Sequence, residues 1–130
     1  MSDASGRILL VDDEPALLKM MHMYLRRLGH DVTIASTTEE AWSQIQAAPD
    51  SFAGAVLDAT MPGLSMEDLA GRILNANPSL FVIAASGYPV DMAAIESTAP
   101  GRVMFLHKPF APEMLARAVR RMLAAQEKEL

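Results

Sequence analysis

The sequence predicts an α/β fold: a doubly wound, five-stranded parallel sheet with helices on both of its faces. Along the 130-residue chain, short apolar runs alternate with longer amphipathic segments. The runs are continuously apolar, which is typical of strands that are buried on both faces of a sheet. The segments between them have helical periodicity, and parallel neighbours need such crossover connections. The expected strands are residues 8–11, 32–35, 55–57, 80–85 and 103–106.

The first helix is expected to open at Asp13-Glu14-Pro15, because a carboxylate at the cap and a proline in the first turn favour a helix start. It should stop at Gly29, since glycine readily adopts the left-handed conformation that ends helices. Its apolar positions recur three and four residues apart and should face the sheet. They are Leu17, Met21, Tyr24, Leu25 and Leu28.

Boundary signals also define the next two helices. Residues 37–40 (Thr-Thr-Glu-Glu) form a predicted capping box, and Pro49-Asp50 breaks the helix that follows it. The third strand ends on Asp58, and a loop containing Gly63 leads to a helix that Asn77-Pro78 closes.

The run 80–85 is the most hydrophobic, so we expect it at the centre of the sheet. A short helix should span about residues 90–97, and Pro112 should open the last helix. We expect a single domain over residues 1–130, with its core at about 7–123 and residues 124–130 forming a helix end or a linker.

Composition excludes several classes of protein. The absence of cysteine rules out disulfide scaffolds and thiolate zinc sites, and it suits a reducing, cytoplasmic environment. The net charge of −5 has the wrong sign for a domain that binds nucleic acid directly. The apolar runs are too short to cross a membrane, so no membrane insertion is expected.

Charged and polar side chains follow or end four of the predicted strands. Asp12 and Asp13 follow the first strand, Asp58 the third, Ser86 the fourth and Lys108 the fifth. The carboxyl ends of parallel strands share one edge, so these side chains should meet in one pocket. Clustered carboxylates repel each other unless a cation neutralises them, and an oxygen-only set favours Mg²⁺, with Mn²⁺ as a substitute. Such a set is suited to phosphoryl transfer.

These residues and their neighbours resemble the receiver domain of bacterial two-component response regulators, of the chemotaxis-regulator type. The resemblance covers about residues 7–123, and it implies the flavodoxin-like strand order 2-1-3-4-5 and a cis Lys108-Pro109 bond. The matching stretches are 8–15 (Ile-Leu-Leu-Val-Asp-Asp-Glu-Pro), 57–63 (Leu-Asp-Ala-Thr-Met-Pro-Gly), 85–87 (Ala-Ser-Gly) and 108–110 (Lys-Pro-Phe).

The resemblance implies that Asp58 is a phosphoacceptor, which takes a phosphoryl group from a histidine kinase or a phosphotransfer protein in a phosphorelay. It further implies that Asp13 binds Mg²⁺ directly and that Asp12 supports the ion. Asp58 and the backbone carbonyl of Thr60 would complete the protein ligands. The domain would assist its own phosphorylation and dephosphorylation without being an enzyme that turns over a separate substrate.

By the same resemblance, Ser86 and Lys108 would hold the phosphoryl oxygens, and Phe105 is similar to the switch aromatic of the family. New charge on Asp58 would draw Ser86 and Lys108 toward it, and Phe105 would then move into the vacated space. The surface of the fourth helix, fifth strand and fifth helix would change, which is where downstream partners bind or a homodimer forms.

Three positions qualify the resemblance. Many receivers carry glycine where this chain has Met66, so the loop entering the third predicted helix is expected to differ. Ser86 replaces the commoner threonine and keeps the hydroxyl donor. Tyr88 places a large ring near the expected pocket mouth, where we predict that it slows attack by water on a phosphorylated Asp58.

Three other functions are alternatives to this one. A phosphatase with an aspartate nucleophile needs a second aspartate two residues later, where this chain has Thr60. A flavin mononucleotide carrier would not place Asp12 and Asp13 at its phosphate site, because carboxylates repel phosphate. A receiver-like module that only binds proteins is the third alternative. The domain could be a stand-alone regulator, a relay intermediate, or part of a hybrid kinase or larger regulator.

Overall fold

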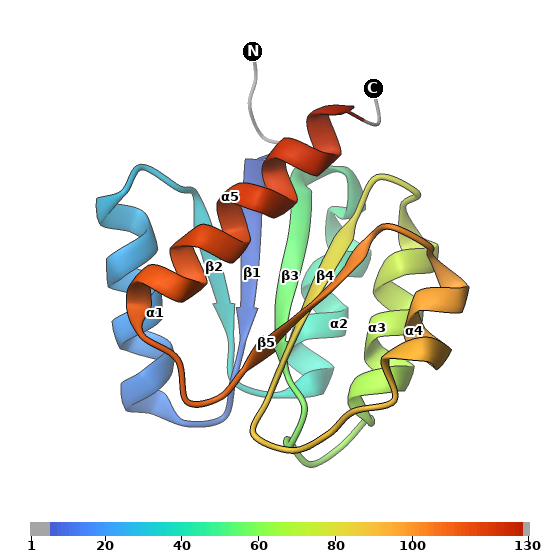
Figure 1. Ribbon diagram of the computed structural model, residues 1–130, viewed down its shortest axis with the longest axis horizontal. Helices are drawn as coiled ribbons and strands as arrows, with labels where there is room; N and C mark the ends of the chain where they lie inside the picture. The colour runs from blue at the N-terminus through green and yellow to red at the C-terminus, as the bar shows by residue number, and fades with distance from the viewer. Residues whose placement is uncertain (1–5, 129–130) are drawn as a thin grey trace.

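The computed structural model describes residues 6–128 and contains a parallel sheet with the strand order β2-β1-β3-β4-β5 (Figure 1). This confirms the predicted α/β fold and strand order. The strands are β1 (Arg7–Val11), β2 (Val32–Ala35), β3 (Phe52–Asp58), β4 (Phe81–Ser86) and β5 (Val103–His107).

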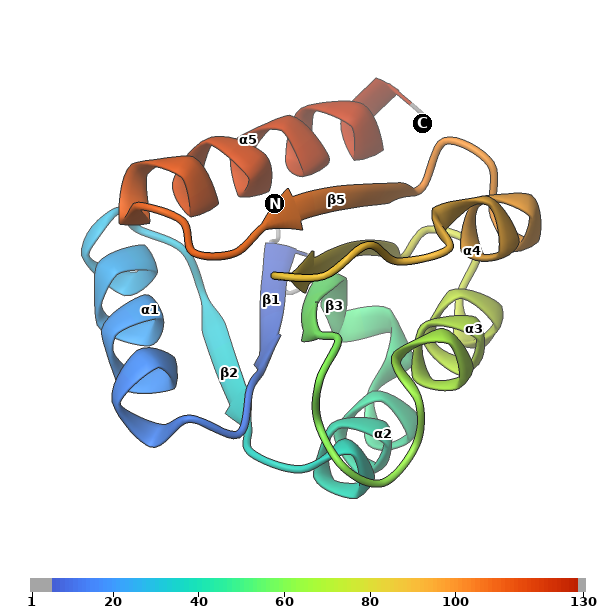
Figure 2. The ribbon, with the colours of Figure 1, turned by 60° about the horizontal axis from the view of Figure 1, so that its bottom comes forward.

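Helices cover both faces of the sheet (Figure 2). One face carries α1 (Pro15–Arg27) and α5 (Pro112–Lys128), and the other carries α2 (Thr38–Ala47), α3 (Met66–Ala76) and α4 (Met92–Thr98). A short 3₁₀ turn, η2 (Pro49–Ser51), precedes β3. Successive side chains of a strand point to opposite faces, so each interior strand contributes to two separate apolar cores. In β1, Ile8 and Leu10 face α1 and α5, and Leu9 and Val11 face the other helices.

The strand predicted to be central, β4, lies between β3 and β5, and β3 occupies the middle of the sheet. The prediction that β4 is the central strand is wrong. Hydrophobicity indicates burial, and because every residue of both β3 and β4 is buried, it could not show which of the two lies in the middle. The strand β3 also begins at Phe52, earlier than predicted. Gly54 interrupts the apolar pattern, so the sequence did not indicate the first part of this strand. The position has no room for a side chain: a Cβ there would lie 2.5 Å from the sulfur of Met122 and 2.6 Å from the carbonyl oxygen of Phe81.

The end of α1 departs from the predicted apolar face. Leu28 is 49% exposed, because the helix ends at Arg27 and the chain then leaves the helical period. Gly29 has a φ of +98°, and its N–H donates to the carbonyl of Arg26 while the N–H of His30 donates to that of Leu25. This pair of bonds is the Schellman arrangement, which supports the prediction that Gly29 stops the helix.

The start of α2 shows a variant of the predicted capping box. The Thr37 hydroxyl accepts a hydrogen bond from the Glu40 N–H at 3.0 Å, as predicted. The Glu40 carboxylate instead accepts from the N–H of Ser36, at 2.8 Å, one residue before the cap. Among the described residues, no helix combines the length and apolar character needed to cross a membrane.

Candidate phosphoacceptor site

The predicted carboxylates meet at the carboxyl edge of the sheet. Asp12 follows β1, Asp58 ends β3, and the two strands are direct neighbours in the sheet. Carboxylate oxygens of Asp12, Asp13 and Asp58 lie within 4.8 Å of one another. Asp12 and Asp58 are buried, while Asp13 is exposed and faces solvent.

Lys108 joins this cluster from the loop after β5. Its Nζ lies 3.1 Å from Asp12 Oδ2 and 3.4 Å from Asp58 Oδ1. The N–H of Lys108 donates to the carbonyl of Ser86, which links the ends of β5 and β4, and the Lys108-Pro109 peptide bond is cis. The ammonium therefore lies between the two buried carboxylates.

The cluster contains a partly buried ion pair between Lys108 and Asp12. Burial raises the pKa of Asp12. Two groups oppose that rise: the N–H of Glu14, which donates to Asp12 Oδ1 at 3.0 Å, and the Lys108 ammonium. For Lys108, burial alone would lower the pKa, but the carboxylates of Asp12 and Asp58 outweigh it and raise the pKa. Lys108 is therefore held in its charged form at neutral pH.

Asp58 has a second anchor in Thr60, which sequence reasoning considered only for its carbonyl. The N–H and the hydroxyl of Thr60 both donate to Asp58 Oδ1, at 3.2 and 3.1 Å. Asp58 Oδ1 therefore accepts hydrogen bonds from Thr60 and also lies next to the Lys108 ammonium. A hydroxyl two residues after a strand-ending aspartate is a local pattern that could have predicted this contact.

Ser86 and Phe105 make their contacts with residues outside the carboxylate cluster. The buried Ser86 hydroxyl donates to the carbonyl of Tyr88 and accepts from its N–H, both at 2.9 Å. Phe105 is 40% exposed, and its ring meets that of His107 edge-on, with the centroids 6.3 Å apart. In this structure the hydroxyl is engaged with its own turn, and the aromatic ring faces outward.

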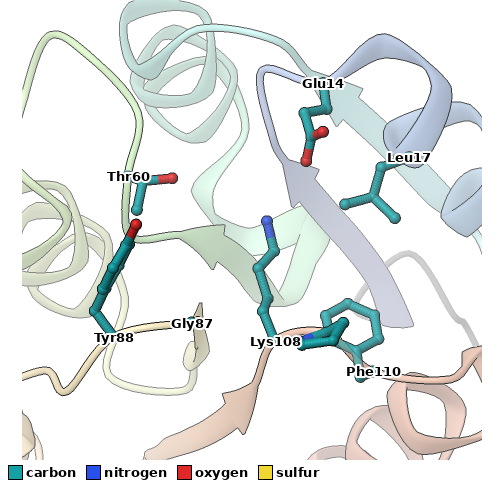
Figure 3. Close-up of a pocket in the computed structure, with 8 residues that line it drawn as sticks. Glu14, Leu17, Thr60, Gly87, Tyr88, Lys108 and Phe110 are labelled. Carbon is teal, nitrogen blue, oxygen red and sulfur yellow. The ribbon is translucent and has the colours of Figure 1, made fainter.

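A pocket of about 550 Å³ opens over the site (Figure 3). The Lys108 side chain extends between Thr60 on one side and Glu14 on the other, and the ring of Tyr88 stands beside Thr60. Met66 does not enter this pocket: it is the buried first residue of α3, and its side chain packs in the core. The lining residues are Glu14, Leu17, Thr60, Gly87, Tyr88, Lys108, Pro109 and Phe110.

A parallel sheet with this strand order and an acidic, lysine-containing pocket at its carboxyl edge defines a receiver domain. The chain belongs to the response regulator receiver domain family, whose sequence model matches residues 8–120. This confirms the resemblance predicted from the four sequence stretches.

Similar proteins and solved structures belong to the same group of response regulators. The chain is 34% identical over 117 residues to the DNA-binding transcriptional regulator NtrC of Rhizobium meliloti (strain 1021), covering 90% of this chain and 24% of that protein. It therefore spans about a quarter of the length of that curated relative. Its structure is similar to a receiver domain protein of Clostridium thermocellum, with a TM-score of 0.84, 26% identity, and coverage of 96% of this chain and 99% of the other. It is also similar to response regulator TrrA of Thermotoga maritima in complex with Mg²⁺-BeF, with a TM-score of 0.77, 25% identity, and coverage of 90% and 98%.

Proposed function

We propose that this receiver domain accepts a phosphoryl group on Asp58 in two-component signal transduction and thereby switches a protein-binding surface. The observation that carries the proposal is the placement of the Lys108 ammonium against Asp58, within a cluster that also holds Asp12 and Asp13. An acceptor carboxylate, a fixed positive charge and a cation site are what phosphoryl transfer requires.

In the transfer step, a carboxylate oxygen of Asp58 forms a bond to the phosphorus atom of a phosphohistidine on a kinase or phosphotransfer protein. The P–N bond of the donor breaks, and the donor ring, which carries a proton on its other nitrogen, leaves with the electron pair of that bond as neutral imidazole. Lys108 neutralises charge on the phosphoryl oxygens, and the Thr60 N–H and hydroxyl keep the Asp58 carboxylate in one orientation.

The donor set of the cluster fits Mg²⁺, because carboxylate oxygens are hard ligands and the open pocket leaves positions for water or phosphate oxygens. Asp12, Asp13, Asp58 and the carbonyl of Thr60 are the residues that would hold it. When bound, the ion supplies charge neutralisation for the reacting oxygens. Mn²⁺ should substitute for it.

For Ser86 to hold a phosphoryl oxygen, its hydroxyl proton must leave the carbonyl of Tyr88. That exchange would loosen the loop after β4, and Phe105 on the neighbouring strand could then turn inward from its exposed position. The surface of α4, β5 and α5 is therefore the proposed site for a downstream protein partner or a phosphorylation-dependent homodimer. We propose a cytoplasmic location, because the sequence has no cysteine and suits a reducing compartment.

The domain would act on itself and not turn over an independent substrate, so we propose a phosphoacceptor and not an enzyme. The similarity to TrrA supports the proposed cation site, since that protein forms a complex with Mg²⁺-BeF. The alternative is a module that binds partners without phosphorylation.

Incubation with Mg²⁺ and acetyl phosphate, followed by intact-mass measurement, tests the proposal. The wild type should gain one labile phosphoryl group and Asp58→Asn none, because the amide is a poor nucleophile. A gain in both proteins would move the acceptor elsewhere, and a gain in neither would support the interaction-only module.

Tyr88 should set the lifetime of the phosphorylated state. Its ring is 69% exposed and stands at the pocket mouth next to Thr60 (Figure 3), where it limits the approach of water. Tyr88→Ala should lose the phosphoryl group faster than the wild type when decay is followed by intact mass. An unchanged decay rate would reject this role.

A further inference from the structure

The loop between Asp58 and α3 is attached to the start of α2 through one buried side chain. The Thr38 hydroxyl accepts a hydrogen bond from the Leu64 N–H at 3.1 Å, across 26 residues of sequence. Thr38 is only 2% exposed, although threonine is a polar residue at the first position of a helix. The helix cap itself is Thr37, so the Thr38 hydroxyl is not needed for capping.

The chemistry of the hydroxyl suits this contact. Its proton is directed to the Glu39 carboxylate, at 3.3 Å, which leaves an oxygen lone pair for the Leu64 N–H. The loop side is shaped to match. Gly63 has a φ of +98°, and a Cβ at that position would collide with Thr38 Oγ1. The close approach of the loop to α2 therefore depends on a hydroxyl at 38 and on glycine at 63.

The same loop is anchored at its other end on the phosphoacceptor. Thr60 holds Asp58 through its N–H and hydroxyl, and only residues 61–63 separate Thr60 from Leu64. Met61 and Leu64 also pack against the apolar core beneath the loop. With so few residues between two anchors, the position of the Thr60 backbone depends on where Leu64 is held.

We propose that Thr38 is a positioning residue for the phosphoacceptor loop: by holding Leu64 it fixes the Thr60 backbone next to Asp58 and the cation site. The inference rests on the proposed function, because that function gives the loop its task. Thr38 touches neither a donor nor a cation; it acts through Leu64 and Thr60.

Three variants test the contact. Thr38→Val removes the hydroxyl at nearly constant shape, Thr38→Ser keeps it, and Gly63→Ala disturbs the same contact from the loop side. Thr37→Val is the matched control, because it removes the cap of the same helix and leaves the Thr38–Leu64 bond in place. The readouts are hydrogen exchange at the Leu64 amide and a MgCl₂ titration followed by the amide NMR signals of Ala59 and Thr60.

Loss of one hydrogen bond corresponds to a change of about two- to tenfold in an equilibrium constant. Thr38→Val and Gly63→Ala should therefore raise both the Leu64 exchange rate and the Mg²⁺ dissociation constant by about that factor. Thr38→Ser should retain the wild-type values of both. Thr37→Val should lower the melting temperature and leave Mg²⁺ affinity unchanged.

Wild-type Mg²⁺ affinity in a folded Thr38→Val or Gly63→Ala protein would overturn the inference, and so would an equal loss of affinity in Thr37→Val. So would a wild type that binds no Mg²⁺. Failure of the proposed function is distinguishable: if acetyl phosphate leaves the wild type unmodified while Thr38→Val still weakens Mg²⁺ binding, phosphorylation is rejected and the positioning role stands.

Discussion

At Lys108, one ammonium group lies against two buried carboxylates, those of Asp12 and Asp58, and offsets part of their charge. Lys108→Met keeps much of the apolar stem and removes the charge, so the two carboxylates would face each other uncompensated. Hydrogen bonds to charged groups contribute about 1.5–3 kcal/mol, and we expect the metal-free variant to lose about that much unfolding free energy. Urea denaturation in the presence of a chelator measures the loss.

The matched control for that prediction is Lys19→Met, which removes an exposed lysine of α1 from the same molecule. Its effect on unfolding should be small, because isolated surface charges contribute little. Equal losses in the two variants would show that the charge of Lys108 is not needed to neutralise the cluster. Added Mg²⁺ should restore part of the stability of Lys108→Met only, since a bound cation would replace the missing charge.

After the end of α1, the fold holds a pH-sensitive side chain, that of His30. Burial and then the nearby charge of Arg120 lower the pKa of His30 below its ordinary value of 6.5. The unfolded chain therefore binds the proton more readily than the folded one. The resulting stabilisation is fully present above pH 6.5 and is lost as the pH falls from 6.5 through the lower pKa of the folded state.

His30→Gln removes the titrating group, so its melting temperature should fall less than that of the wild type between pH 7 and pH 5. Thermal denaturation monitored by circular dichroism at several pH values measures the difference between the two proteins. Parallel curves over that range would contradict the lowered pKa.

The helices and strands were predictable where local signals agree with packing. Gly29 stops α1 and Thr37 caps α2 because each works through backbone groups within a few residues. Leu28 was misjudged because α1 ends at Arg27, so the apolar period does not extend to it. Gly54 was misjudged because its environment depends on a distant segment: Met122 of α5 fills the space over it.

The same distinction applies to the site. The placement of Asp12, Asp58 and Lys108 at one edge follows from parallel strands, so the sequence was enough to predict their proximity. The Thr38 contact could not be predicted, because its partner lies 26 residues away on an irregular loop. The Ser86 hydroxyl was also unpredictable in this state, since its bonds to Tyr88 depend on the exact turn after β4.

For the molecule as a whole, the cluster of Asp12, Asp13 and Asp58 should make stability depend on divalent cations. A ligand that binds only the folded state stabilises it by mass action, by about 2.7 kcal/mol at a concentration 100 times its dissociation constant. MgCl₂ should therefore raise the melting temperature of the wild type in a saturable way. NaCl at equal ionic strength should not reproduce the rise, because it only screens exposed charges.

Asp13→Asn is the decisive variant for that effect, because Asp13 is the exposed member of the cluster and its loss should leave the partly buried Asp12–Lys108 pair intact. We expect it to fold and to lose most of the Mg²⁺ response, while Glu67→Gln, an exposed acid at the start of α3, should keep it. Differential scanning fluorimetry across a MgCl₂ series measures all three proteins. A full response in Asp13→Asn would place the cation elsewhere, and an equal loss in Glu67→Gln would reduce the effect to general charge neutralisation.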